Sequence, residues 1–194
     1  MELKEDPTGA LVSMAKEFAK KAHETQVRKY TNEPYFVHCE EVAKTVAAVD
    51  NSTQEMIAAA YLHDTVEDTQ VTLEQIRTLF GETVASLVEM VTDVSKKTDG
   101  NRAIRKKIDM EHIAKASPEG KTIKLADLIS NSRSIVDGDP GFAKVYLAEK
   151  TELLKVLKEG DSELLALAHT VLAEGIKDLK DKFINFDQRK KPVF

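Results

Sequence analysis

The chain has 194 residues and a formal net charge of −5, and its 42% hydrophobic and 31% charged residues are typical of an ordinary soluble globular domain. The acidic balance argues against a general nucleic-acid binder, and the lack of a long apolar run or a signal-peptide pattern argues against membrane insertion and export. The single cysteine, Cys39, excludes an internal disulfide and a multi-cysteine zinc site, and it is typical of the reducing cytoplasm.

Helix-forming residues dominate the chain, whereas glycine (8) and proline (5) are scarce and alternating β-branched runs are hard to find. We predict an all-α fold: one compact helical bundle over residues 1–182, followed by a C-terminal tail at 183–194. Turns are expected at 118–120 and 137–141. The expected helices lie at about 8–23, 35–49, 53–62, 73–80, 82–94, 103–116, 121–135, 142–158 and 162–180.

The helix expected at 53–62 is the most apolar of these, because residues 57–62 read Ile-Ala-Ala-Ala-Tyr-Leu, and it should be central. His63 and Asp64 follow it directly. A carboxylate buried alone costs several kcal/mol, so Asp64 must be paired, solvated or bound to a metal. An exposed helix end is the alternative interpretation of this dipeptide.

Two residues on other expected helices favour the metal. His38 lies near the start of the helix at 35–49, and Asp127 lies near the middle of the helix at 121–135. Histidine and aspartate ligands from three core helices form a mixed nitrogen and oxygen set that suits a divalent ion such as Mn²⁺, Fe²⁺ or Zn²⁺.

An acidic pair follows the histidine-aspartate dipeptide. If the helix continues, Glu67 lies one turn beyond His63, and Asp68 lies one turn beyond Asp64. Both carboxylates then face the ligand side and are free to orient or deprotonate a water molecule, as hydrolysis requires. A solvated acidic helix end is again the alternative.

Three longer strings carry a resemblance to a known family. They are Arg-Lys-Tyr-Thr-Asn-Glu-Pro-Tyr-Phe-Val-His at 28–38, Leu-His-Asp-Thr-Val-Glu-Asp-Thr at 62–69 and Lys-Leu-Ala-Asp at 124–127. Together they resemble the HD superfamily of metal-dependent phosphohydrolases, and specifically the hydrolase domain of RelA/SpoT-type alarmone enzymes and their small stand-alone relatives. The similarity covers roughly residues 10–180.

This resemblance implies an all-helical enzyme that removes the 3′-pyrophosphate of guanosine tetra- or pentaphosphate, typically with Mn²⁺, and that carries no synthetase domain. The implied metal ligands are His38, His63, Asp64 and Asp127, the implied catalytic pair is Glu67 and Asp68, and the implied nucleotide contacts are Arg28, Lys29 and Asn131. The chain departs from the family pattern at Leu128 and Ser130, where the family has arginine and histidine.

Positive charge is concentrated at residues 95–107, which contain six lysines and arginines but a single acidic residue, Asp99. Such a segment can steer and hold a polyphosphate, and Arg105 is the preferred phosphate contact; a solvated helix face is the alternative. Tyr146 can stack on or contact the base, or it can be an ordinary core tyrosine. We interpret His23, His112 and His169 as structural or surface residues.

Other functions stay open at this point. A different phosphohydrolase of the same superfamily can act on an adenine alarmone, NADPH or an ordinary nucleotide, and a sensor can bind the nucleotide without turning it over. The expected partner is therefore a small-molecule nucleotide rather than nucleic acid or a membrane. An apolar face from Phe142 onward is compatible with a homodimer.

Overall fold

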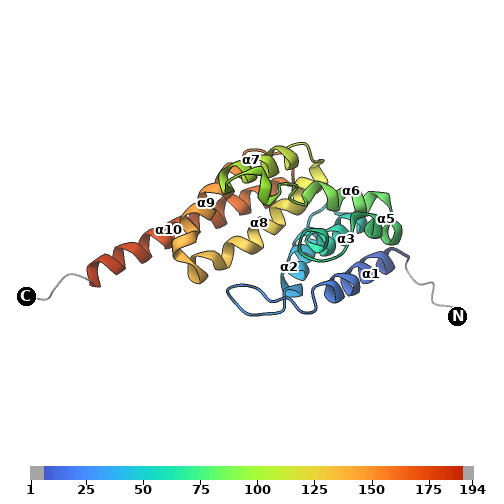
Figure 1. Cartoon of the computed structure of the whole chain (residues 1–194), viewed down its shortest axis with the longest axis horizontal. Coiled ribbons are helices and arrows are strands. Elements are labelled where there is room, and N and C mark those ends of the chain that lie inside the picture. The colour runs from blue at the N-terminus through green and yellow to red at the C-terminus, as the bar shows by residue number, and fades with distance from the viewer. Residues whose placement is uncertain (1–6, 190–194) are drawn as a thin grey trace, which may run out of the picture.

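The computed structural model of the chain describes residues 7–189, and within that range it is helical without β-strands (Figure 1), which confirms the all-α prediction. No helix in this range is both long and apolar enough to cross a membrane. The α-helices are α1 (Pro7–Ala22), α2 (Phe36–Ala47), α3 (Gln54–Leu62), α4 (Thr65–Asp68), α5 (Leu73–Phe80), α6 (Glu82–Val91), α7 (Arg102–Ile113), α8 (Pro118–Gly138), α9 (Pro140–Leu154) and α10 (Ser162–Arg189), with a short 3₁₀ helix, η1, at Lys97–Asp99.

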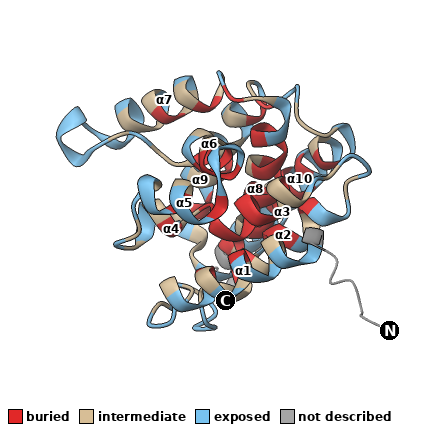
Figure 2. Ribbon diagram, turned by 90° about the vertical axis from the view of Figure 1, so that its right-hand side faces the viewer, coloured by how far each residue is buried: buried red, intermediate tan, exposed pale blue. Residues whose placement is uncertain are grey.

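Two helices form the centre of the fold. In α3 every residue from Ala58 to Leu62 is buried, as expected for a helix that is apolar on all sides. The longer α8 packs against α2, α3, α6, α9 and α10. Figure 1 shows α1, α2, α3, α5 and α6 at one end of the molecule and α9 and α10 at the other, with α8 running between them. The buried residues in Figure 2 gather on these central helices.

Both expected turns around α8 were wrong. Ser117 caps α8 by accepting a hydrogen bond from the Gly120 N–H, and Pro118 takes the first helical position, where its missing N–H costs nothing. At the other end Asp139 alone separates α8 from α9, and its side chain accepts from the Phe142 N–H at 3.0 Å. Residues typical of turns therefore cap helices here.

The last two helices also differ from expectation. Helix α9 ends at Leu154, before residue 158, and α10 continues to Arg189 instead of ending near 180. Residues 183–189 of the expected tail are thus helical, whereas residues 190–194 lie outside the described range. The single domain at 1–182 stays a prediction.

Candidate metal centre

Two histidines and two aspartates from three parts of the fold meet at one point. His38 lies in α2, Asp127 lies in α8, and His63 and Asp64 form the break between α3 and α4. The Nε2 atoms of His38 and His63 are 3.2 Å apart, and Asp64 Oδ2 lies 3.4 Å and 3.0 Å from them. Asp127 Oδ1 lies 3.4 Å from His38 Nε2 and 3.8 Å from His63 Nε2. The four predicted metal ligands are therefore neighbours in the folded chain.

The position of the protons on the two imidazoles follows from their second nitrogens. His63 Nδ1 lies 2.8 Å from the carbonyl oxygen of Ala60, which only accepts, so Nδ1 carries a proton. His38 Nδ1 lies 2.9 Å from the Ser130 hydroxyl oxygen. That hydroxyl gives its single proton to Glu41 Oε2 at 2.6 Å, so it must accept from His38. Both neutral imidazoles therefore present an Nε2 lone pair to the common centre.

Two lone pairs and two carboxylates around one point require a positive charge. In the absence of a metal a proton supplies it: burial opposes protonation of His38, but hydrogen bonds to Asp127 and Asp64 outweigh burial and raise its pKa to about 9. His38, His63 and Asp64 offer ligand atoms that all lie within 4.8 Å of one another, with Asp127 beside them, and imidazole nitrogen with carboxylate oxygen is a donor set that divalent metals accept. The residues present thus fit a divalent metal.

The hydrogen bonds of His38 continue outward to the guanidinium of Arg28. Glu41 Oε2 accepts from the Ser130 hydroxyl and, at 3.1 Å, from Arg28 Nη1. Hydrogen bonds of this kind fix the orientation and the tautomer of a ligating imidazole. Ser130 therefore orients His38.

Each candidate aspartate ligand also has an outer partner. The Tyr35 hydroxyl donates to Asp64 Oδ2 at 2.6 Å. Lys124 Nζ lies 3.1 Å from Asp127 Oδ2, and burial is outweighed by this charge and by the His38 hydrogen bond, so the pKa of Asp127 is well below its usual range. Sequence reasoning assigned no role to Tyr35 or Lys124, although both lie inside the strings that carried the resemblance.

Glu67 and Asp68 lie in α4, which is separated from α3 by His63 and Asp64 rather than continuous with it. Asp68 nevertheless lies one helical turn beyond Asp64, as predicted, because its N–H donates to the Asp64 carbonyl oxygen at 2.9 Å. Glu67 Oε2 accepts from the Asp93 N–H at 3.1 Å. Although both side chains are exposed, surrounding protein partly desolvates their carboxylates, which raises the pKa of Asp68 and raises that of Glu67 to about 7.

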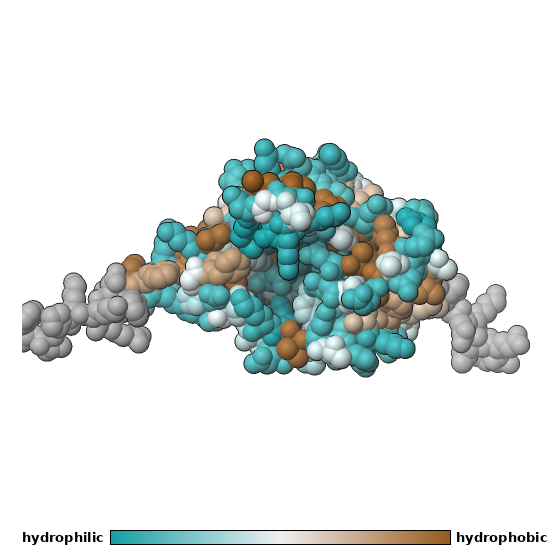
Figure 3. Space-filling model, viewed as in Figure 1, coloured by the Kyte–Doolittle hydropathy of each residue, from teal (hydrophilic) through white to brown (hydrophobic). Residues whose placement is uncertain are grey.

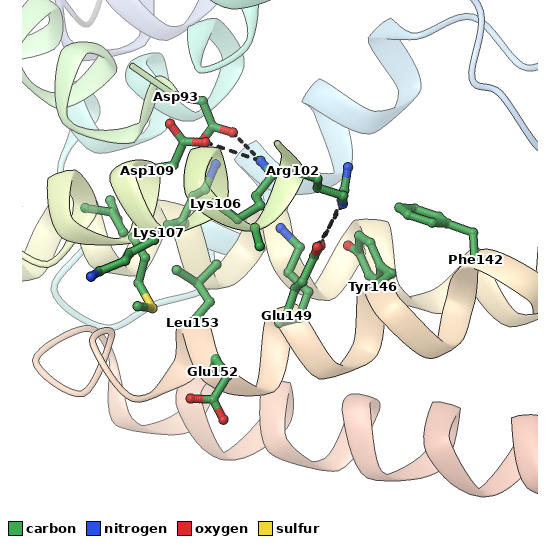
Figure 4. A pocket seen from close by; sticks show the side chains of 15 residues that line it. Asp93, Arg102, Lys106, Lys107, Asp109, Phe142, Tyr146, Glu149, Glu152 and Leu153 are labelled. Carbon is green, nitrogen blue, oxygen red and sulfur yellow. Dashed lines mark hydrogen bonds and ion pairs between the residues drawn. The ribbon is translucent and has the colours of Figure 1, made fainter. Parts of the chain in front are cut away.

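A cavity of about 620 Å³ lies beside this centre, between α7, α8 and α9, and its size is typical of small-molecule sites. Figure 3 shows this face of the molecule hollowed at its middle, with mainly hydrophilic side chains around the hollow. The charged residues that line the cavity are Asp93, Arg102, Lys106, Lys107, Asp109, Lys124, Glu149, Lys150 and Glu152 (Figure 4). A smaller cavity of about 190 Å³ shares Phe142 and Tyr146 with it.

The predicted nucleotide contacts divide between these two cavities. Arg28, Lys29 and Asn131 line the smaller one, and Tyr146 lines both. Asn131 Nδ2 also donates to Asp127 Oδ1 at 2.6 Å, which ties it to the candidate metal centre.

Arg105, which the sequence predicts to contact a phosphate, is not among the residues that line either cavity, so its role stays a prediction. The cavity face of α7 holds Arg102, Lys106 and Asp109, which recur at helical spacing, and Arg105 falls on a neighbouring strip of the helix. Its Nε is buried and has no hydrogen-bond partner in the described part of the chain. Of the cations in the basic segment, Arg102, Lys106 and Lys107 line the larger cavity.

Comparison with known proteins gives a family match and close relatives. The model of the HD domain matches residues 15–173. The chain is 35% identical over 175 residues to guanosine-3′,5′-bis(diphosphate) 3′-pyrophosphohydrolase MESH1 of Xenopus tropicalis, which covers 86% of this chain and 96% of that protein. It is 37% identical over 171 residues to the guanosine-3′,5′-bis(diphosphate) 3′-pyrophosphohydrolase of Aquifex aeolicus, covering 86% of this chain but 22% of that protein.

A solved structure is similar as well. It is that of a metazoan orthologue of SpoT, described as hydrolysing ppGpp, and it superimposes with a TM-score of 0.75 at 28% sequence identity. The superposition covers 85% of this chain and 95% of that one.

Proposed function

The chain belongs to the HD-domain family, and on that premise we propose that it hydrolyses guanosine 3′,5′-bis(diphosphate), and the corresponding pentaphosphate, to GDP or GTP and pyrophosphate. The observation that carries the proposal is the convergence of His38, His63, Asp64 and Asp127 beside a cavity of nucleotide size whose lining includes an arginine and four lysines. Relatives with this named activity support the choice of substrate. We further propose that Mn²⁺ is the metal and that the enzyme removes the alarmone of the stringent response in the cytoplasm.

In this proposal the four converging residues hold the metal. A bound divalent metal supplies positive charge that makes water a stronger acid. Glu67 and Asp68 orient the attacking water and accept its proton, because their raised pKa values make them effective bases near neutral pH. The water oxygen joins the phosphorus on the 3′ oxygen, the bond from that phosphorus to the 3′ oxygen breaks, and the 3′ oxygen takes up a proton from solvent to become the hydroxyl of GDP or GTP.

The cations around the cavities neutralise the substrate's charge. Arg28, Lys29 and Asn131 contact the nucleotide from the smaller cavity, and Tyr146 contacts it from the wall that both cavities share. Arg102 and Lys106 of α7 also line the larger cavity, but each is already paired with a carboxylate of the protein, Glu149 and Asp93 respectively. Preorganised charges of this kind stabilise the transition state more than water does.

A panel of nucleotides tests the substrate. The purified protein is incubated with Mn²⁺ and either the guanosine tetraphosphate, an adenine alarmone, NADPH or an ordinary nucleotide, and the products are separated by chromatography. We expect GDP and pyrophosphate from the first of these and little turnover of the others. Preferred turnover of another nucleotide overturns the choice of substrate, and tight binding without pyrophosphate release identifies a sensor.

Ser130→Ala is expected to weaken Mn²⁺ binding by about 10- to 100-fold, the usual effect of removing a hydrogen-bond partner from a ligating histidine. The variant removes the acceptor of the His38 Nδ1 proton and so frees the imidazole to rotate. Isothermal titration with Mn²⁺ measures the effect. Ser132→Ala is a matched control, because Ser132 is also buried in α8 but donates to the Leu128 carbonyl oxygen at 2.7 Å. Equal affinities in the two variants contradict the role of Ser130.

Metal affinity is expected to rise with pH, because metal binding displaces the proton held by His38. The pKa of His38 is raised from 6.5 to about 9 in the metal-free protein. The proton on His38 therefore stabilises the metal-free fold fully below pH 6.5, and this stabilisation is lost as the pH rises through about 9. Titration calorimetry at about pH 7 in two buffers of different ionisation enthalpy measures proton release. Absence of proton release on Mn²⁺ binding contradicts the displacement of a proton from His38 by the metal.

A further inference from the structure

Of the cations that line the larger cavity, all but one form an ion pair with a carboxylate among the described residues. Arg102 Nε and Nη2 each lie 2.8 Å from a Glu149 carboxylate oxygen. Lys106 Nζ lies 2.6 Å from Asp93 Oδ2 and 3.5 Å from Asp109 Oδ2 (Figure 4). These two cations are therefore neutralised within the protein.

The same holds for two of the remaining lysines. Lys124 Nζ lies 3.1 Å from Asp127 Oδ2 and donates to the Val91 carbonyl oxygen at 3.3 Å. Lys107, at the exposed edge, lies 3.8 Å from Glu111.

Lys150 is the exception. Among the described residues no carboxylate forms an ion pair with Lys150, and its Nζ lies 5.2 Å from the centroid of the Tyr146 ring. Burial and the neighbouring Lys124 lower the pKa of Lys150, and the more distant carboxylates of Asp127 and Asp93 oppose this only in part. An uncompensated ammonium inside a cavity is stabilised when an anion enters.

A second group in the same wall also lacks a partner. The Tyr146 hydroxyl is buried and makes no hydrogen bond within the described residues. Ser132 lies beside it and donates its own proton to the Leu128 carbonyl oxygen, so it does not donate to the Tyr146 hydroxyl. Tyr146 and Lys150 are one turn apart on α9, so a donor hydroxyl and an ammonium share one face of the helix.

We propose that Lys150 and Tyr146 form a binding subsite for a diphosphate group of the substrate. A diphosphate supplies the negatively charged partner that Lys150 lacks. Its oxygens can also accept hydrogen bonds from the Lys150 ammonium and from the Tyr146 hydroxyl. Resting on the proposed function, this assigns Lys150 to one of the two diphosphates of the alarmone: the 5′-diphosphate, which leaves as part of GDP, or the 3′-pyrophosphate. Lys150 is a binding residue and takes no part in the proton transfers.

Direct binding of the two products distinguishes these sources. With Mn²⁺ present, calorimetry measures the dissociation constants of GDP and of inorganic pyrophosphate for the wild type and for Lys150→Met. We expect the constant for one of the two ligands to rise about 10-fold or more, the usual effect of losing a charge-assisted hydrogen bond. A rise for GDP alone identifies the 5′-diphosphate, and a rise for pyrophosphate alone identifies the leaving group.

Two further variants make the result specific. Lys144→Met removes the same charge from an exposed position of α9 and should leave both constants unchanged. Lys150→Arg keeps the charge and should retain most of the binding. Because Lys150→Met removes a half-buried cation that pairs with no carboxylate among the described residues, the ligand-free variant should melt at a temperature at least as high as the wild type, which excludes misfolding as the cause.

Steady-state kinetics complete the test. If Lys150 binds the 5′-diphosphate, which is away from the reacting bond, its loss should raise KM for the alarmone while kcat changes little; if it binds the 3′-pyrophosphate, which holds the reacting phosphorus, kcat should fall as well. Unchanged constants and an unchanged KM in Lys150→Met overturn the subsite, even if the wild type hydrolyses the alarmone. If the wild type binds diphosphates through Lys150 but releases no pyrophosphate from the alarmone, the subsite stands and the proposed function fails.

Discussion

Replacement of Asp64 by alanine is expected to abolish both metal binding and turnover. Asp64 Oδ2 lies within 3.4 Å of the Nε2 atoms of His38 and His63 and supplies one of the two negative charges at the centre. Without it, two neutral nitrogens and Asp127 are left, and Asp127 already has Lys124 as a counter-charge. The remaining donors offset too little of the cost of desolvating a divalent ion.

The melting temperature measured with and without Mn²⁺ reports this loss independently of activity. At a Mn²⁺ concentration about 100 times the dissociation constant, binding stabilises the wild type by about 2.7 kcal/mol, which raises the melting temperature of a chain of this size by about 5 to 11 °C. Asp64→Ala should show no such rise. Asp64→Asn, which keeps the shape but not the charge, should behave in the same way.

Asp161→Ala serves as the matched control for this measurement. The Asp161 carboxylate caps α10 by accepting from the backbone N–H groups of Glu163 and Leu164, far in sequence from the four candidate ligands. Its removal should lower the melting temperature by the usual effect of a lost helix cap while leaving the metal-induced rise intact. A full metal-induced rise in Asp64→Ala contradicts the assignment of Asp64 as a ligand.

The fold class and the four converging residues were accessible from the sequence for a local reason. Composition and periodicity decide between helix and strand, and His38, His63, Asp64 and Asp127 lie in or beside short strings that are recognisable one by one. Helix ends were less accessible. Pro118 is compatible with a turn or with the first position of a helix, and only packing of the following residues decides between them.

Roles that depend on contacts between residues far apart in the chain could not be predicted from the sequence. Ser130 matters because it meets Glu41, which lies 89 positions away, and nothing in either neighbourhood signals that contact. The sequence does not distinguish Lys150 from the other lysines. It stands out only in the structure, where Arg102, Lys106 and Lys124 pair with the nearby carboxylates. Arg105 was chosen by its position in a basic run, whereas the phase of α7 around its own axis selects Arg102 and Lys106 for the cavity.

Replacement of Glu67 by glutamine is expected to keep the metal and to lose most of the rate, with kcat falling by about 100- to 10,000-fold. Glutamine has the size of glutamate, and its side-chain oxygen can still accept from the Asp93 N–H, so the local structure should be retained. What disappears is the ability to take up a proton. Metal analysis of the purified variant should therefore give the wild-type stoichiometry.

The pH profile separates loss of a base from loss of structure. A base works only when it is deprotonated, so the wild-type rate should rise with pH through the pKa of Glu67, which desolvation raises to about 7 in the metal-free protein. A bound cation lowers this pKa, so the rising limb of the metal-loaded enzyme should lie at or below pH 7. Glu67→Gln should lack the limb. A variant that hydrolyses the alarmone at the wild-type rate, or that keeps the same limb at a lower rate, assigns the proton transfer to another group, of which Asp68 is the nearest in sequence.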